Sequence, residues 1–361
     1  MRISLERLFD LLAVREWVTD PAGVRPGIKF TNGAAASTRY LRPILVRTLV
    51  DEFLKLRTHP IAIDTLSLWK GGERYDASAW SYKCRQHGFS MESLGTEIFL
   101  AEGYTGMDSK TFMNKKGKKI RVLEVGATIT YCQVLTMLTH VTGHPFLGFF
   151  GAIADLGIGC TAKKGKMRIH EDFQPTVNME TCNKCGLCQR LCGWAAITIN
   201  ETVHIDPKKC VGCGKCIVKC PQDAIEVSND QLVDFQIKVA DASSFVVQAM
   251  DGKIGYFNFI IDVTPNPDED SNSGIPFIPD LGILASKDPV AVDKATLDIV
   301  NRVPGVPGSA AEQFNVLERE TAKFKMISGA DPMVQIKTAE ELGLGTTNYK
   351  FIDAWELQED E

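Results

Sequence analysis

Hydrophobic residues recur along most of the chain at spacings typical of helices and of strands, and the two kinds of segment alternate. Spacings of three and four residues predict helices over residues 5–17, 39–56, 78–89 and 233–250, and another that begins at Asp288-Pro289. Short apolar runs between turn residues predict strands over residues 24–31, 61–66, 97–101, 119–125, 133–138, 254–263 and 281–285. Strands that alternate with helices in this way are typical of an α/β domain with a mostly parallel sheet.

A cysteine-rich segment, residues 176–228, interrupts this alternation and holds eight of the chain's 11 cysteines. The helix and strand pattern stands on both sides of the segment. We therefore predict a discontinuous α/β host domain formed by residues 1–175 and 229–361. The inserted α+β unit, residues 176–228, should begin and end at neighbouring points on that host.

The eight cysteines form two runs with the same spacing, C-x2-C-x2-C-x3-C, and Pro221 follows the second run. Bacterial ferredoxins use this spacing to hold two [4Fe–4S] clusters, and the fourth cysteine of each run binds the other run's cluster. The spacing therefore predicts one [4Fe–4S] cluster held by Cys182, Cys185, Cys188 and Cys220, and a second held by Cys210, Cys213, Cys216 and Cys192.

An internal repeat supports the ferredoxin-type interpretation. A shift of 28 residues carries the first cysteine run onto the second, and it also carries Gly186 onto Gly214 and Ala196 onto Ala224. A pair of zinc knuckles or a disulfide framework is the alternative interpretation. Zinc sites usually leave a longer gap between their C-x2-C pairs, and disulfides do not suit a chain without an export signal.

Composition narrows the classes of partner. The net charge of −5 gives no reason to expect binding to nucleic acid. No apolar run reaches the roughly 18 residues of a membrane span, and charges come too early for a signal peptide. We therefore expect a cytoplasmic protein without a membrane span, and the reduced thiolates suggest a low-oxygen setting.

Charged residues gather where the predicted strands end. Lys29, Asp64, His140, His144 and Asp262 each follow or end a strand, and in open α/β sheets ligands bind at that edge. We predict that these side chains converge on one pocket facing the cluster of Cys182, with His140, His144 and Asp64 in catalytic roles. Lys29 and Asp262 would bind an anionic substrate or cofactor, together with three cationic side chains: Arg39, Arg42 and Lys166. The alternative is that these are strand-end residues with ordinary loop hydrogen bonds.

The host sequence resembles a known family, the bacterial and archaeal domain of unknown function three hundred sixty-two, in its form with an inserted two-cluster ferredoxin. The matching stretches are residues 38–47, 64–71, 140–144, 151–159, 252–262 and 278–291. The resemblance implies an α/β host, iron–sulfur clusters and a redox role, without a substrate. Two departures stand out: relatives carry lysine where this chain has Ala154, and Cys-Asp-Cys where it has Pro267, Asp268 and Glu269.

The leading functional prediction is an iron–sulfur oxidoreductase of unknown substrate. Low-potential electrons from an external protein such as a ferredoxin would pass through two [4Fe–4S] clusters to a small, anionic substrate or cofactor. His140 or His144 would donate the proton. Two alternatives remain open: a non-catalytic electron-transfer subunit that docks to a larger redox enzyme, and a metal or cofactor assembly protein. A flavin or an additional metal is compatible with the sequence but not indicated by it.

Overall fold

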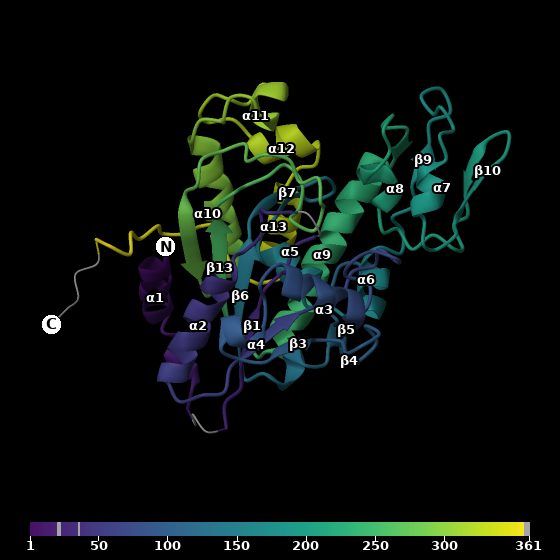
Figure 1. The fold of residues 1–361 in the computed structure, drawn as a ribbon. Coiled ribbons are helices and arrows are strands. Elements are labelled where there is room, and N and C mark those ends of the chain that lie inside the picture. The colour runs from purple at the N-terminus through teal and green to yellow at the C-terminus, as the bar shows by residue number, and fades with distance from the viewer. Residues whose placement is uncertain (20–22, 35–36, 357–361) are drawn as a thin grey trace.

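A six-stranded sheet forms the centre of the computed structural model, which describes residues 1–19, 23–34 and 37–356 (Figure 1). In sheet order its strands are β14 (Gly282–Ser286), β13 (Ile254–Ile260), β6 (Val134–His140), β1 (Pro26–Lys29), β2 (Ile61–Asp64) and β3 (Ile98–Leu100). Every neighbouring pair runs parallel except β13 and β14, which are antiparallel. The prediction of a mostly parallel sheet is confirmed.

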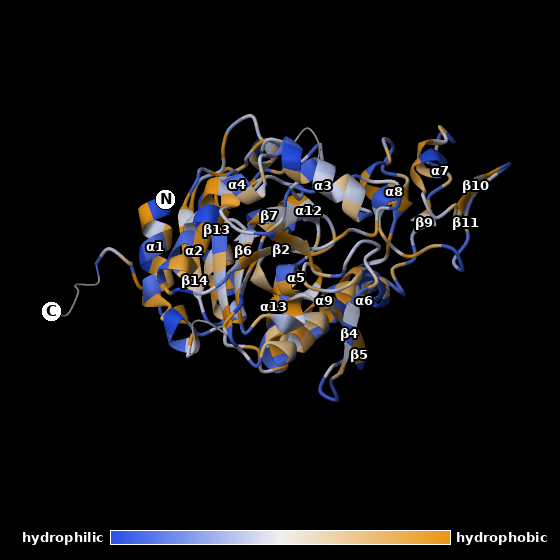
Figure 2. Cartoon of the chain, turned by 60° about the horizontal axis from the view of Figure 1, so that its bottom comes forward, coloured by the Kyte–Doolittle hydropathy of each residue, from blue (hydrophilic) through white to orange (hydrophobic). Residues whose placement is uncertain are grey.

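Helices cover both faces of the sheet because its strands are apolar on both sides. Along β13, Tyr256 packs into one core and Phe257, the next residue, packs into the other. One face is covered by α5 (Ala152–Gly157) and α9 (Asn229–Ala249). The opposite face is covered by α1 (Arg2–Leu11), α2 (Pro43–Lys55), α3 (Ala77–Gln86) and α4 (Met91–Leu94). Figure 2 shows both hydrophobic and hydrophilic residues on α1 and α2, as expected for helices with one buried side.

A third apolar cluster joins the last helices to the antiparallel edge of the sheet. These helices are α10 (Pro289–Arg302), α11 (Ala310–Gln313), α12 (Lys323–Ser328) and α13 (Met333–Glu341). The predicted start of α10 is confirmed, since the Asp288 carboxylate accepts hydrogen bonds from the backbone N–H groups of Val290 and Ala291. Among the helices of the described residues, none is long and apolar enough to cross a membrane.

Three sequence predictions need correction. The helix expected over residues 5–17 is divided, because the chain turns at Ala13 (φ 50°) between α1 and the 3-10 helix η1 (Val14–Trp17). The strand expected over 119–125 is β5 (Val122–Gly126), which pairs with β4 (Ser109–Met113) outside the main sheet.

The loop expected after β6 holds two short strands. These are β7 (Thr142–His144) and β8 (Gly148–Phe150), which pair with each other as a hairpin. Two short helices, α6 (Lys163–Ile169) and the 3-10 helix η2 (Ile129–Tyr131), complete the host elements.

The cysteine-rich segment extends from one end of the sheet-bearing part (Figure 1). Its elements are β9 (Thr176–Val177), α7 (Leu187–Leu191), β10 (Ile197–Ile199), β11 (Val203–Ile205), α8 (Lys215–Val218) and β12 (Ile225–Glu226). The first strand, β9, pairs antiparallel with the last, β12, so the two ends of the segment are direct neighbours. This pairing is what an insertion requires, and the division into two domains stays a prediction.

Candidate functional site

The eight cysteine thiols gather in two sets of four, and each set lines its own small cavity. We call the first set, Cys182, Cys185, Cys188 and Cys220, the outer thiol set. We call the second set, Cys192, Cys210, Cys213 and Cys216, the inner thiol set. In each set the fourth cysteine of one run lies with three cysteines of the other run.

The sequence repeat is also a repeat of backbone conformation. Positive φ angles occur at Lys184 and Gly212 (56° and 68°), and again at Gly186 and Gly214 (77° and 70°). Both pairs are separated by the repeat length. The backbone N–H groups of Ala196 and Ala224 donate to the sulfurs of Cys192 and Cys220, at 3.4 and 3.3 Å. Two copies of one loop therefore present their thiols in the same way.

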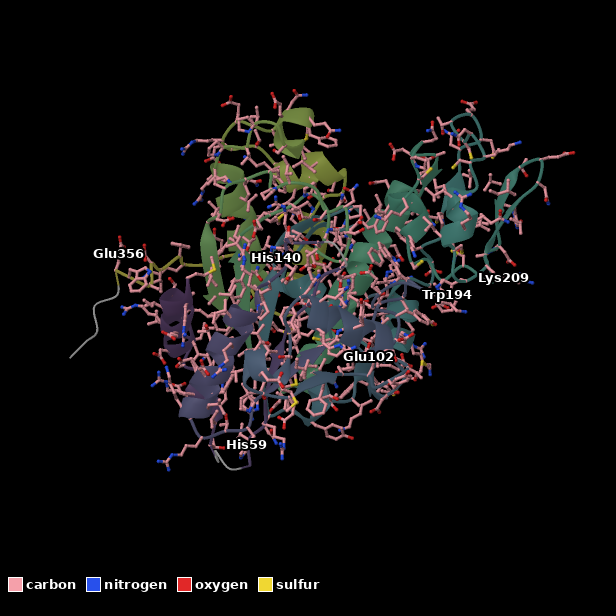
Figure 3. The ribbon with its side chains drawn as sticks, viewed as in Figure 1. His59, Glu102, His140, Trp194, Lys209 and Glu356 are labelled. Carbon is pink, nitrogen blue, oxygen red and sulfur yellow. The ribbon has the colours of Figure 1, made fainter. Side chains whose placement is uncertain are left out.

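The inner thiol set lies against the host. Trp69 Nε1 donates a hydrogen bond to the carbonyl oxygen of Cys213 at 2.9 Å, and Trp194 Nε1 donates to the carbonyl oxygen of Leu68 at 3.1 Å. Figure 3 places Trp194 at the junction between the host and the cysteine-rich segment. An ion pair between Lys219 and Asp270 adds a charged contact across the same junction.

A cavity of about 360 Å³ lies at this junction. Its walls come from the loop after β2, the β7–β8 hairpin, α6 and the cysteine-rich segment. Residues that line it include Trp69, Arg74, His144, Phe146, Lys166 and Cys213. We call it the junction cavity. Its volume is within the range of small-molecule sites.

Beneath the junction cavity lies a network of buried charges. Lys29 is fully buried, and its Nζ lies 3.1 Å from Asp155 Oδ1 and 3.6 Å from Asp64 Oδ1. Burial lowers the pKa of Lys29, but the carboxylates of Asp155 and Asp64 outweigh it and hold that pKa above its ordinary value. Arg74 Nη2 in turn lies 2.9 and 3.0 Å from the two oxygens of Asp64. These contacts make Lys29 and Asp64 parts of a closed network.

Lys166 reaches the junction cavity from α6. Its Nζ donates to Thr65 Oγ1 at 2.8 Å and to the carbonyl oxygen of Leu66 at 2.6 Å, and lies 3.8 Å from Glu102 Oε1. Burial lowers the pKa of Lys166 and raises the pKa of Glu102. Each shift reduces the free energy needed to move a proton between them.

His144 lines the junction cavity as a neutral ring. Burial first, and then the neighbouring His170, lower the pKa of His144 to about 3. The Phe146 N–H donates to His144 Nδ1 at 3.2 Å, so the ring proton of the neutral form is on Nε2. The side chain can therefore donate a hydrogen bond from Nε2 near neutral pH, but it is not the protonated imidazolium that a proton donor requires.

His140 lies apart from the cavity lining, in the interior of the host (Figure 3). Its Nε2 donates to the carbonyl oxygen of Ile261 at 2.8 Å, and its Nδ1 lies 3.2 Å from Asp268 Oδ2. Burial lowers the pKa of His140, but the hydrogen bond and charge of Asp268 raise it above the ordinary value overall. Both ring nitrogens are thus engaged.

Asp262 also lies outside the cavity lining. Its carboxylate pairs with Arg39 Nη1 at 3.2 Å and with Arg42 Nη2 at 2.6 Å. The predicted site therefore divides into three groups. His144 and Lys166 line the cavity, Lys29 and Asp64 lie in the network beneath it, and the remaining four lie elsewhere: His140, Asp262, Arg39 and Arg42.

The structure also places the cavity beside a different thiol set from the one we expected. Cys213, of the inner thiol set, lines the cavity, and no residue of the set around Cys182 does so among the described residues. The reason is the packing of the host: the loop that carries Trp69 contacts the second cysteine run, through the hydrogen bond to Cys213.

Sequence reasoning missed Arg74, Trp69, Glu102 and Glu269 as site residues. Trp69 stands within the stretch 64–71 that carries the family resemblance, which was the available signal for it. Arg74 comes from an irregular loop and had no such signal. Pro267 and Glu269, two positions where this chain differs from its relatives, line the cavity. Ala154, another such position, is buried inside α5.

No group of three or more His, Cys, Asp or Glu side chains in the described ranges is arranged to hold a single metal ion. The thiol sets each surround a cavity, and their donors are the four cysteine sulfurs that an iron–sulfur cluster requires.

Comparison with known proteins identifies the family. A profile described as "Domain of unknown function (DUF362)" matches residues 25–298, most of the chain. The protein belongs to this family, as the sequence resemblance predicted.

Parts of the chain are also similar to segments of other proteins. The chain is 43% identical over 47 residues to one subunit of an ion-translocating oxidoreductase complex of Methanosarcina acetivorans, a match to 13% of this chain and 18% of that protein. It is 36% identical over 74 residues to an uncharacterized polyferredoxin-like protein of Methanocaldococcus jannaschii, covering 20% and 33% of the two chains. The chain thus spans a third or less of the length of either relative.

Among solved structures, the lactate racemase apoprotein of Thermoanaerobacterium thermosaccharolyticum aligns with 83% of this chain and 56% of its own, at 8% identity and a TM-score of 0.44.

Proposed function

We propose that the protein is an iron–sulfur electron-transfer protein that delivers electrons to a small molecule in the junction cavity. The outer and inner thiol sets would each hold one [4Fe–4S] cluster, with Cys220 and Cys192 as the crossed fourth ligands. The observation that carries the proposal is that Cys213, of the inner thiol set, lines the same cavity as Arg74 and Lys166.

The donor sets fit such clusters. Four sulfurs surround each cavity, and backbone N–H groups already point at the sulfurs of Cys192 and Cys220. When bound, clusters with four thiolate ligands supply one-electron transfer, in a range that extends to low potentials. Hydrogen bonds to the sulfurs are one of the protein's means of adjusting that potential.

The two thiol sets differ in exposure, which suggests different tasks for them. Cys185, in the outer thiol set, is exposed, so a donor protein such as a ferredoxin can approach that set closely. The inner thiol set is covered by the host loop of Trp69. Electrons would therefore enter at the outer set and leave from the inner set.

The cavity side chains would bind the acceptor and supply a proton. Aromatic side chains, including Trp69 and Phe146, would keep water away from a ligand bound beside Cys213. Lys166 holds a proton on Nζ that burial makes easier to release, and Glu102 lies behind it. We therefore assign the proton donor to Lys166, in place of His140 and His144.

The named relatives agree with this class of function. An ion-translocating oxidoreductase subunit and a polyferredoxin-like protein share segments with this chain. Their names support an electron-transfer role and identify no substrate for it.

The proposal is tested by mixing anaerobic protein with a chemically reduced bacterial ferredoxin in a stopped-flow spectrometer. We expect the broad visible absorption of the protein to bleach, and to recover when an oxidant is added. Protein that carries iron but neither bleaches nor recovers would refute an electron-transfer role.

A further inference from the structure

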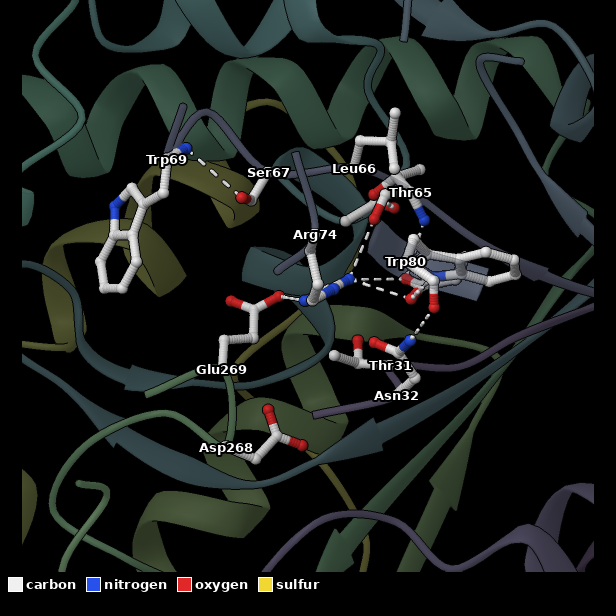
Figure 4. Close-up of polar contacts among 12 residues, drawn as sticks. Thr31, Asn32, Thr65, Leu66, Ser67, Trp69, Arg74, Trp80, Asp268 and Glu269 are labelled. Carbon is white, nitrogen blue, oxygen red and sulfur yellow. Dashed lines mark hydrogen bonds and ion pairs between the residues drawn. The ribbon is translucent and has the colours of Figure 1, made fainter. Parts of the chain in front are cut away.

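Arg74 and Glu269 form an asymmetric ion pair at the wall of the junction cavity. The Arg74 side chain is 6% exposed and the Glu269 side chain is 42% exposed. Both line the cavity, and Glu269 contacts Arg74 Nη1 (Figure 4). The guanidinium is therefore fixed, whereas its partner carboxylate comes from a side chain partly open to water.

Arg74 keeps its position without Glu269. Its Nη2 donates to both oxygens of Asp64 and to the carbonyl oxygen of Thr65 at 2.9 Å. Nη1, the atom that contacts Glu269, is the guanidinium atom that a ligand carboxylate would take over, through a charge-assisted hydrogen bond.

The rest of the cavity wall is aromatic. Trp69, Phe146, Phe150 and Phe235 all line it. Flat rings pack against such walls in offset or edge-on arrangements that add to the free energy of simple burial. A flat, conjugated ligand suits this cavity better than a saturated one of the same size.

We propose that the junction cavity binds planar, conjugated carboxylates, and that the ligand carboxylate takes the place of Glu269 on Arg74. The proposal rests on the proposed function, in which this ligand is the electron acceptor. The exchange replaces one carboxylate on Arg74 by another, so it adds no unpaired charge to the buried network. Glu269, already partly in water, turns outward at small cost.

Glu73 provides a matched control for Glu269. Its side chain also lines the cavity, is 48% exposed, and pairs with Lys83 at 3.3 Å. Glu73→Gln removes the same charge from the same cavity and leaves the Arg74–Glu269 contact in place.

The test is calorimetric titration of the oxidised, cluster-loaded full chain with three probes: naphthoate, naphthamide and decahydronaphthoate. We expect naphthoate to bind at least about tenfold more tightly than naphthamide, since a charge-assisted contact is lost with the charge. We expect decahydronaphthoate to bind at least about threefold more weakly than naphthoate, because decahydronaphthoate is not flat.

Glu269→Gln should tighten naphthoate binding by about threefold and leave naphthamide binding unchanged, because the internal competitor is gone. Glu73→Gln should leave the naphthoate affinity within about twofold of the parent. Equal tightening in both variants would mean a general charge effect and would overturn the exchange at Arg74.

Failure to bind any probe, or equal affinity for naphthoate and naphthamide, would overturn the ligand class. Equal affinity for naphthoate and decahydronaphthoate would overturn the requirement for a flat ligand. Each sample is then reduced by the ferredoxin of the earlier assay. Normal bleaching without naphthoate binding rejects this inference alone, whereas absent bleaching rejects the proposed function.

Discussion

Replacing Lys29 with methionine tests whether this residue is part of the structural network or a ligand-binding cation. The side chain is 1% exposed, and its Nζ contacts Asp155 Oδ1 at 3.1 Å and the carbonyl oxygen of Phe30 at 2.9 Å. Lys29→Met leaves Asp155 buried with one remaining side-chain partner among the described residues, Thr139 Oγ1 at 3.0 Å. Asp64, by contrast, keeps both bonds to Arg74.

One buried carboxylate is therefore left without its cation. Breaking a buried ion pair in this way costs about 3–5 kcal/mol of unfolding free energy. For a chain of 361 residues the loss corresponds to roughly 4–7 °C in melting temperature. The exposed Lys55 is the matched control: its side chain is 64% exposed and pairs with Glu52, so Lys55→Met should cost less than about 1 kcal/mol.

The pH dependence of the effect follows from the shifted pKa. Burial lowers the pKa of Lys29, but Asp155 and Asp64 raise it above its ordinary value overall. A raised lysine pKa stabilises the fold fully below the unfolded value of about 10.4, and the stabilisation is lost as pH rises through the folded value. The deficit of Lys29→Met should therefore stay constant between about pH 6 and 9.

The assay is thermal unfolding of anaerobic protein followed by far-ultraviolet circular dichroism. Lys29→Met combined with Asp155→Asn should recover at least half of the lost stability, since the second change removes the unpaired charge. A single variant that melts within about 2 °C of the parent would refute the structural role. If that variant also lost naphthoate binding, Lys29 would be a ligand-binding residue.

Two further predictions concern single side chains. Cys192→Ser should damage the cluster of the inner thiol set and leave the outer one largely intact, so electron paramagnetic resonance of the reduced protein should lose one signal; loss of both signals would contradict the crossed assignment. His144 has its pKa lowered to about 3 by burial, so its contribution to stability is present above about pH 6.5 and is lost as pH falls toward the folded value. His144→Asn should flatten the fall in melting temperature between about pH 6.5 and 4, and an unchanged slope would contradict that shift.

The repeated cysteine spacing predicted how the thiols would gather, because each run is local and its geometry is set by its own loop. The grouping of Cys192 with the second run, and of Cys220 with the first, follows from that spacing. The strands of the sheet were also predictable, since an apolar run such as β13 is buried on both faces.

The partners of the strand-end charges could not be predicted, because they come from distant parts of the chain. Asp155, which neutralises Lys29, lies on α5 and is 126 residues away in sequence. Asp262 likewise pairs with Arg39, which lies in a loop 223 residues away in sequence. A charge at a strand end looks available for a ligand until such a partner is placed beside it.

Measuring the metal content of the anaerobically purified protein tests the central claim most directly. Two [4Fe–4S] clusters predict about eight irons and about eight acid-labile sulfides per chain, with broad visible absorption that bleaches on reduction. Near-stoichiometric zinc, without sulfide and without visible absorption, would contradict the assignment of both thiol sets and the electron-transfer function built on it.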